Sequence, residues 1–248
     1  MLPEAESAPA AKRATPLRLL KVGGVAPFTA TDYPGQLAAV LFVQGCPWRC
    51  GYCHNTHLQP RTREGAVSWA KVMSFLARRV GLIDAVVFSG GEPTSDPALA
   101  TAIGDVRALG FKIGLHSAGT HPRRFERVLP LVDWVGFDVK APFEDYEQVT
   151  RMRESGTFAQ RSLEALLSSG VDYECRTTAH PSLLTDVDLL KLAHALSSMG
   201  VKKHFLQIFR KQGSLDAALN AVGTTGYPSG PTLDEMRRLF PTFDVRRG

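Results

Sequence analysis

Six short apolar segments, separated by stretches with the apolar spacing of helices, constrain the fold of this chain more than any other feature. They are residues 38–43, 85–89, 112–116, 134–138, 173–177 and 204–208. Their β-branched and aromatic residues are typical of buried parallel strands. Strands that alternate with helices predict a parallel sheet with the helices outside it. Six strands are fewer than the eight of a closed barrel, so an open partial barrel and a doubly wound sheet are the two candidates.

Helix signals occur between these segments. Ser68 and Thr185 are placed to cap helices, and the pair Asp96 and Pro97 is placed to begin another. A shorter helix is expected over residues 122–129. Helix ends are expected at glycines 110, 170 and 200, because glycine accepts the left-handed conformation that often follows a helix.

The ends and composition of the chain suggest a simple organisation. Residues 1–16, rich in Ala, Pro and Glu, predict a disordered leader, and residues 17–248 predict one domain. No apolar run approaches the roughly 18 residues of a membrane span, and none follows a basic start as in a secretory signal. We therefore expect a cytoplasmic protein that binds neither membrane nor nucleic acid. The net charge of +5 fits an anionic ligand, an acidic partner or weak nucleic-acid contact, and by itself it does not choose among them.

Polar residues stand where the predicted strands end. In parallel α/β folds, chemistry collects at the carboxyl ends of the strands, which meet at one edge. In strand order, the candidates are Cys46; Gly90, Gly91 and Glu92; His116 and Ser117; Asp138 and Lys140; Arg176 and Thr177; and Gln207. The pattern predicts that they share one rim.

Three of the four cysteines, Cys46, Cys50 and Cys53, lie within eight residues in the spacing C-x3-C-x2-C. Thiolates suit zinc, copper and iron–sulfur clusters. Structural zinc normally takes four protein ligands, so it would need His54 or a distant group as well. A cubane cluster with three protein ligands leaves one iron open for a small molecule, which the spacing suits better. Incidental buried thiols are a further alternative, but this loop does not resemble a core stripe.

This spacing, with the aromatic Tyr52 before the last cysteine, resembles the signature of the radical S-adenosylmethionine superfamily. The resemblance implies that Cys46, Cys50 and Cys53 hold a [4Fe–4S] cluster. It also implies that S-adenosylmethionine chelates the fourth iron through its amino and carboxylate groups. Cleavage of the sulfonium then yields a 5′-deoxyadenosyl radical, so the cofactor carries the difficult chemistry while the protein positions and shields it.

Two further motifs support this resemblance. Gly90 and Gly91 let the backbone approach a ligand, and the Glu92 carboxylate can receive an ammonium group. Alone, the triplet is equally typical of a strand-to-helix turn, but it matches the superfamily element that binds the methionyl amino group. Asp138 and Lys140 resemble the D-x-K element of glycyl-radical activases, which touches the methionyl part of the cofactor. Alone, they can also be read as an exposed ion pair.

Other assignments rest on position. His116 and Ser117 align with a segment where related activases carry Asp-Thr-Asn-Gly, so His116 either reaches the cofactor or is a structural histidine. Gln207 is placed to touch the adenosyl moiety. Arg176 and Thr177 are placed to meet the ribose or the carboxylate. Cys175, within a predicted strand, is interpreted as a buried core cysteine.

Residues 28–54 closely resemble the activating proteins of anaerobic ribonucleoside-triphosphate reductase, including a loop of residues 28–35 before the first predicted strand. The resemblance implies a partial (β/α)6 barrel of parallel strands with outer helices. It also implies a glycyl-radical partner, the large subunit of that reductase, and a flavodoxin- or ferredoxin-type electron donor. The alternatives are a radical enzyme with a small substrate, as in deazaguanine synthesis, and a non-enzymatic zinc-binding interaction module.

Overall fold

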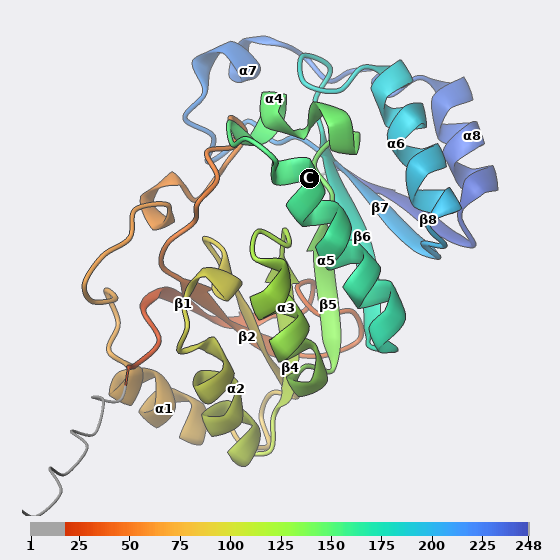
Figure 1. Ribbon diagram of the computed structural model, residues 1–248. Helices are drawn as coiled ribbons and strands as arrows, with labels where there is room; N and C mark the ends of the chain where they lie inside the picture. Colours follow the sequence, from red (N-terminus) through yellow and green to blue (C-terminus); the bar gives the residue numbers. More distant parts are fainter. Residues whose placement is uncertain (1–17, 248) are drawn as a thin grey trace, which may run out of the picture.

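The computed structural model describes residues 18–247, which form one eight-stranded sheet (Figure 1). The predicted leader lies outside these residues, and the division into a leader and one domain stays a prediction. The strands are β1 Val22–Thr29, β2 Ala38–Val43, β3 Ala85–Gly90, β4 Lys112–Ser117, β5 Trp134–Asp138, β6 Asp172–Ala179, β7 Lys203–Ile208 and β8 Thr242–Arg246. Their order in the sheet is their order in the sequence. A doubly wound sheet would reverse its order at a switch point, so the prediction of an α/β partial barrel is confirmed.

The predicted count of six strands misses one strand at each edge of the sheet. The six predicted segments are β2 to β7, all parallel, while β8 adds a parallel strand beside β7 and β1 pairs antiparallel with β2. Both extra strands are mostly half-buried or exposed, so neither carries a continuous apolar run. The loop predicted over residues 28–35 is also corrected, because Phe28 and Thr29 belong to β1.

The helices occupy the segments between the strands. They are α1 Trp69–Ala77, α2 Leu99–Ala108, α3 Pro122–Val128, α4 Tyr146–Thr150, α5 Ser155–Ser169, α6 Asp186–Ser198, α7 Ala217–Ala221 and α8 Gly230–Leu239. Ser68 caps α1 and Thr185 caps α6, as predicted, and Thr185 also forms a capping box with Asp188. The N-cap residue of α2 is Ala98, so the predicted start at Asp96 and Pro97 is corrected. The Asp96 carboxylate instead accepts a hydrogen bond from the Ala98 amide in the preceding turn. No helix in the described part of the chain is long and apolar enough to cross a membrane.

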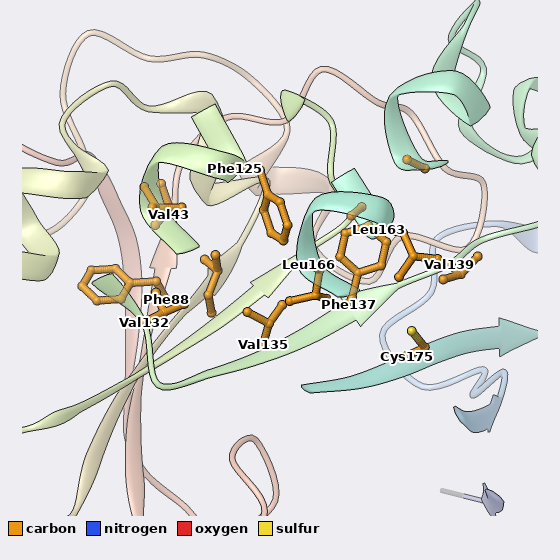
Figure 2. Close-up of a cluster of buried hydrophobic side chains, with 14 of the residues drawn as sticks. Val43, Phe88, Phe125, Val132, Val135, Phe137, Val139, Leu163, Leu166 and Cys175 are labelled. Atoms are coloured by element: carbon orange, nitrogen blue, oxygen red, sulfur yellow. The ribbon is translucent and has the colours of Figure 1, made fainter. Parts of the chain in front are cut away.

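The main hydrophobic core lies between the sheet and the helices (Figure 2). Phe88 on β3, Phe137 on β5 and Phe125 on α3 are all fully buried there. Phe125 packs edge-on against Phe137, with ring centroids 5.6 Å apart. Cys175 on β6 also lies in this core and is fully buried, as the sequence interpretation holds.

A smaller apolar cluster lies on the opposite face of the sheet. Tyr33, from the loop after β1, stacks on Trp134 with ring centroids 5.0 Å apart. Gly114 on β4 makes room for it, because a Cβ atom there would lie 3.1 Å from the Tyr33 ring. The loop after β1 therefore covers part of this face, and its Asp32 carbonyl reaches His116 near the carboxyl end of β4.

Candidate active site

A cavity of about 210 Å³ lies at the carboxyl ends of β2 to β6. It is lined by Cys46, Trp48, Cys50, Tyr52, Cys53, His54, Asn55, Gln59, Ser89, Gly90, Gly91, Glu92, His116, Ser117, Ala118, Asp138, Lys140, Arg176 and Thr178. Every predicted site residue except Thr177 and Gln207 is in this set. Gln207, half-buried on β7, lies one strand beyond the cavity and does not line it.

Backbone hydrogen bonds fix the cysteine loop that follows β2. The Cys46 amide donates to the Gln59 carbonyl at 3.0 Å, and the Arg49 amide donates to the Thr150 carbonyl at 2.9 Å. The Arg49 guanidinium donates to the carbonyl of Cys46 at 2.6 Å, and Trp48 is buried beneath the loop. The loop is thus held from both sides before any cofactor binds.

The cysteine side chains suit a multi-iron cluster. All three line the same cavity, but among the described residues no three histidine, cysteine or acidic side chains converge on a single-ion position. In a cubane each thiolate binds its own iron, so the ligands need not converge. Burial and the nearby Glu92 raise the pKa of Cys46 to about 12, and burial raises the pKa of Cys50. Both are thiols at neutral pH, so binding a cluster releases protons.

His54 does not complete a zinc site. Its Nε2 atom lies 2.9 Å from the Arg210 carbonyl oxygen, and its ring stacks on Phe209 with centroids 5.8 Å apart. The ring therefore anchors the loop after β7 to the cysteine loop.

The two glycines at the end of β3 bring that strand against the cysteine loop. Gly90 has a φ of +108°, and a Cβ atom there would lie 2.5 Å from the Val43 amide nitrogen. A Cβ atom at Gly91 would lie 2.5 Å from the Gly45 carbonyl oxygen. The Glu92 amide donates to that same oxygen at 2.9 Å. Only glycine permits this approach without moving backbone.

Glu92 is 1% exposed, and its carboxylate already accepts four hydrogen bonds. Thr94 donates twice to Oε1, Ser117 donates to Oε1 at 2.8 Å, and the Ala118 amide donates to Oε2 at 2.9 Å. Burial raises the pKa of Glu92, and these donors oppose that rise. A carboxylate offers about four acceptor positions, two on each oxygen, so Oε2 has one left for an ammonium group. Glu92 chiefly ties the end of β3 to the end of β4.

Ser117 and His116 are also held by protein partners. The Ser117 hydroxyl donates to Glu92 and accepts from the Gly119 amide at 3.0 Å. His116 Nδ1 lies 3.2 Å from the Ser89 hydroxyl, and Nε2 lies 2.8 Å from the Asp32 carbonyl oxygen. Burial and the neighbouring Arg176 lower the pKa of His116 to about 4, so its ring is neutral at pH 7.

Asp138, Lys140 and Arg176 form a charged group on the cavity wall. Arg176 donates to Asp138 Oδ1 through Nε at 3.0 Å, and its Nη2 lies 2.9 Å from the same oxygen. Lys140 Nζ lies 3.5 Å from Asp138 Oδ2 and 5.5 Å from the centroid of the Tyr52 ring. Asp138 is 37% exposed, while Lys140 is 12% exposed. These three groups carry a net charge of +1, and the Glu92 carboxylate lines the same cavity.

The pKa directions agree with that charge distribution. Burial alone would raise the pKa of Asp138, but Arg176 and Lys140 hold it below its usual value. Burial alone would lower the pKa of Lys140, but its neighbours Tyr52 and Asp138 hold it above its usual value. Asp138 is therefore an anion and Lys140 a cation across the neutral range, a pair suited to the zwitterionic end of an amino acid.

Sequence reasoning placed Arg176 and Thr177 together at the strand end, but alternation along β6 separates them. Arg176 and Thr178 line the cavity, whereas the Thr177 hydroxyl lies 3.0 Å from His204 Nε2 on the buried side. The signal for Thr178 was the two-residue period of a strand. Trp48 and Ser89 also line the cavity and were not selected from the sequence. Nothing in the sequence distinguishes their positions from ordinary loop and strand residues.

Comparison with known proteins identifies relatives along most of the chain. A protein of Methanocaldococcus jannaschii named as a glycyl-radical enzyme activating enzyme is 28% identical over 204 residues, which cover 79% of this chain and 82% of the relative. The pyruvate formate-lyase-activating enzyme of Clostridium pasteurianum is 28% identical over 178 residues, covering 68% and 72%.

Solved structures share the fold at low identity. The structure of QueE from Escherichia coli has a TM-score of 0.54 at 16% identity and covers 92% of this chain and 93% of its own. SuiB from Streptococcus suis, bound to S-adenosylmethionine, has a TM-score of 0.59 at 12% identity, covering 83% of this chain and 48% of its own.

The family match connects the cavity to its chemistry. The sequence model described as the radical SAM superfamily matches residues 40–196, which include the three clustered cysteines and the elements around Glu92 and Asp138. Members of this superfamily use a [4Fe–4S] cluster and S-adenosylmethionine, so the predicted cofactors are confirmed. This chain belongs to the radical S-adenosylmethionine superfamily.

Proposed function

We propose that this enzyme cleaves S-adenosylmethionine reductively to install a glycyl radical on a partner, the large subunit of anaerobic ribonucleoside-triphosphate reductase. The observation that carries the proposal is the similarity, along most of the chain, to a relative named as a glycyl-radical enzyme activating enzyme. The resemblance of residues 28–54 to the activating proteins of that reductase supports this partner over other glycyl-radical enzymes.

The roles of the cavity residues follow from their contacts. Cys46, Cys50 and Cys53 would hold three irons of the cluster, because their side chains line one cavity on a prepositioned loop. When bound and reduced, the cluster and S-adenosylmethionine supply a carbon radical that takes a hydrogen atom from the substrate. The protein therefore needs no base at the reacting carbon, and its task is to bind, orient and shield.

The methionyl end of the cofactor would lie across the charged wall. We place its amino group near Gly90 and Gly91, where it can donate one hydrogen bond to Glu92 Oε2. Lys140 would attract the carboxylate, and Asp138, held by Arg176, would fix the direction of Lys140. We assign His116 and Ser117 positioning roles, because protein partners already use their polar atoms.

The radical acceptor would be a glycine backbone in a loop of the partner, which would enter the open side of the barrel. A flavodoxin- or ferredoxin-type protein would supply the electron. We place the enzyme in the cytoplasm, because a reducing compartment preserves the free thiols that bind the cluster.

The test is radical transfer between purified proteins without oxygen. The reconstituted enzyme is reduced with dithionite and mixed with S-adenosylmethionine and the reductase large subunit. We expect an electron paramagnetic resonance signal of a glycyl radical on the reductase, together with 5′-deoxyadenosine. Pyruvate formate-lyase is the matched control. A radical on that protein alone would overturn the choice of partner, and turnover of a small molecule without any partner would favour the alternative radical enzyme.

A further inference from the structure

A second cavity, of about 470 Å³, lies beside the cysteine loop. Pro47 and Trp48 of that loop form part of its wall. The rest comes from the loop before α3, from the first residues of α3, and from Met152, Phe158 and Arg161 at or near α5. This cavity is thus built between the cysteine loop and the outer helices.

The walls of this second cavity are basic. They include Arg123, Arg124 and Arg161, and they contain no aspartate or glutamate. Arg124 donates to the Ser95 carbonyl at 2.8 Å, so its guanidinium is held in place. Arg123 and Arg161 are exposed, and within residues 18–247 neither forms an ion pair. Two positive charges at this mouth therefore lack an internal counterion.

The interior of the second cavity is apolar, although its rim is basic. Burial, Arg124 and Arg61 together lower the pKa of His121 to about 4. The His121 ring is therefore uncharged at neutral pH. Together with Trp48, Met152 and Phe158 it gives the hollow an apolar interior. An apolar interior with a basic rim suits the acidic surface of a protein.

Trp48 connects this hollow to the candidate active site. It lines both cavities and is 1% exposed, so its side chain forms part of the wall of each. Its indole Nε1 is buried and has no hydrogen-bond partner among the described residues. A molecule seated in the second cavity would contact the cysteine loop without entering the first.

Separate access is what an electron donor needs. In the proposed reaction, S-adenosylmethionine and the target loop occupy the first cavity, at the carboxyl ends of β2 to β6. A protein that reduces the cluster while those groups are bound must approach from another side. The second cavity provides such an approach, from the helix side of the same loop.

We propose that the surface formed by Arg123, Arg161 and the hollow around Trp48 is the docking site for an acidic one-electron carrier protein. One electron passes from the reduced flavin or iron–sulfur centre of the carrier to the oxidised cluster, the carrier is oxidised by one electron, and no atom is transferred. The inference rests on the radical chemistry of the proposed function and not on the identity of the radical acceptor.

The test compares Arg123→Glu/Arg161→Glu with a control double variant of equal charge change. Lys71→Glu/Arg78→Glu serves as the control, because both side chains are exposed, at α1 and its C-cap, and neither lines the second cavity; α1 and α3 are separate helices in Figure 1. Binding of a flavodoxin and of a plant-type ferredoxin is measured by calorimetry, together with the rate at which each reduced carrier bleaches the cluster. Circular dichroism melting shows whether each variant is folded.

We expect the wild type to bind at least one carrier and the Arg123→Glu/Arg161→Glu variant to bind it about tenfold more weakly or worse, because like charges then face each other. The difference should shrink at about 0.5 M NaCl, where exposed charges are screened. The control variant should bind like the wild type, and dithionite should support equal cofactor cleavage in all three proteins.

Three results would overturn the docking site. They are the absence of binding to either carrier, unchanged affinity of Arg123→Glu/Arg161→Glu for both the carrier and the reductase, or, with reductase binding measured by the same calorimetry, weakened affinity for the reductase alone. The last result would make this surface part of the substrate interface. Failure of the proposed function would appear separately, as carrier binding and cofactor cleavage without a glycyl radical.

Discussion

Replacing Gly91 with alanine perturbs the contact that holds the cysteine loop against β3. The new Cβ atom would lie 2.5 Å from the Gly45 carbonyl oxygen and 2.8 Å from its carbonyl carbon. Both atoms are backbone atoms next to Cys46, and the Glu92 amide already donates to that oxygen. A side chain could rotate away, but this backbone cannot, so the cysteine loop has to move.

The size of the effect follows from that overlap. Overpacking costs about 1–3 kcal/mol of the free energy of unfolding. In a protein of this size each kcal/mol shifts the melting temperature by about 2–4 °C. We therefore expect Gly91→Ala to melt about 2–12 °C below the wild type. It should also retain less iron after reconstitution, because Cys46 is displaced with the loop.

Gly104→Ala is the matched control. Gly104 is exposed within α2, and a Cβ atom there meets nothing within 4 Å. Alanine should stabilise this helix by about 0.5–1 kcal/mol, so the two glycine substitutions are predicted to have opposite signs. The assays are thermal unfolding by circular dichroism and iron content per chain. If Gly91→Ala matches the wild type in both, the loop does not depend on this close approach, and the reasoning is refuted.

Other substitutions distinguish residues that serve the candidate site from residues that serve the core. Cys50→Ala should abolish the visible absorbance of the cluster, whereas Cys175→Ala should keep it, since that thiol lies in the core. Asp138→Asn should weaken S-adenosylmethionine binding measured by calorimetry and destabilise the fold by only about 1 kcal/mol, because Arg176 loses a partner that is partly solvent-exposed. Burial lowers the pKa of His204 to about 3, below its unfolded value, so its contribution to stability is complete above about pH 6.5 and falls as the pH drops further. When the pH is lowered from 7 to 5, the free energy of unfolding measured with urea should therefore fall less in His204→Gln than in the wild type. Equal falls in the two proteins would contradict this assignment.

The parts of the fold that could be predicted from sequence are those with a local signal. The strands β2, β3 and β5 each contain a short apolar run, and Thr185 with Asp188 forms the capping box of α6. The edge strands β1 and β8 could not be found this way, because an edge strand shares its surface with solvent and lacks such a run.

In the candidate site, too, only the residues in contiguous motifs could be predicted from the sequence. The clustered cysteines and the glycines beside Glu92 are contiguous motifs, so they could be selected directly. The hydrogen bonds of Glu92 to Ser117 and Ala118 join two strands, and the pairing of Asp138 with Arg176 depends on the register of β5 and β6. No local pattern reveals such contacts. The basic cavity beside Trp48 was missed for the same reason, since its arginines come from separate segments of the chain.

Transfer of a labelled hydrogen tests the proposed reaction most directly. The reductase large subunit would be produced with α-deuterated glycine and incubated without oxygen with the reconstituted enzyme, dithionite and S-adenosylmethionine. Mass spectrometry then measures deuterium in the 5′-deoxyadenosine that forms. The account predicts one deuterium per molecule and a glycyl radical on the reductase. Unlabelled 5′-deoxyadenosine, with no radical on the reductase, would contradict it.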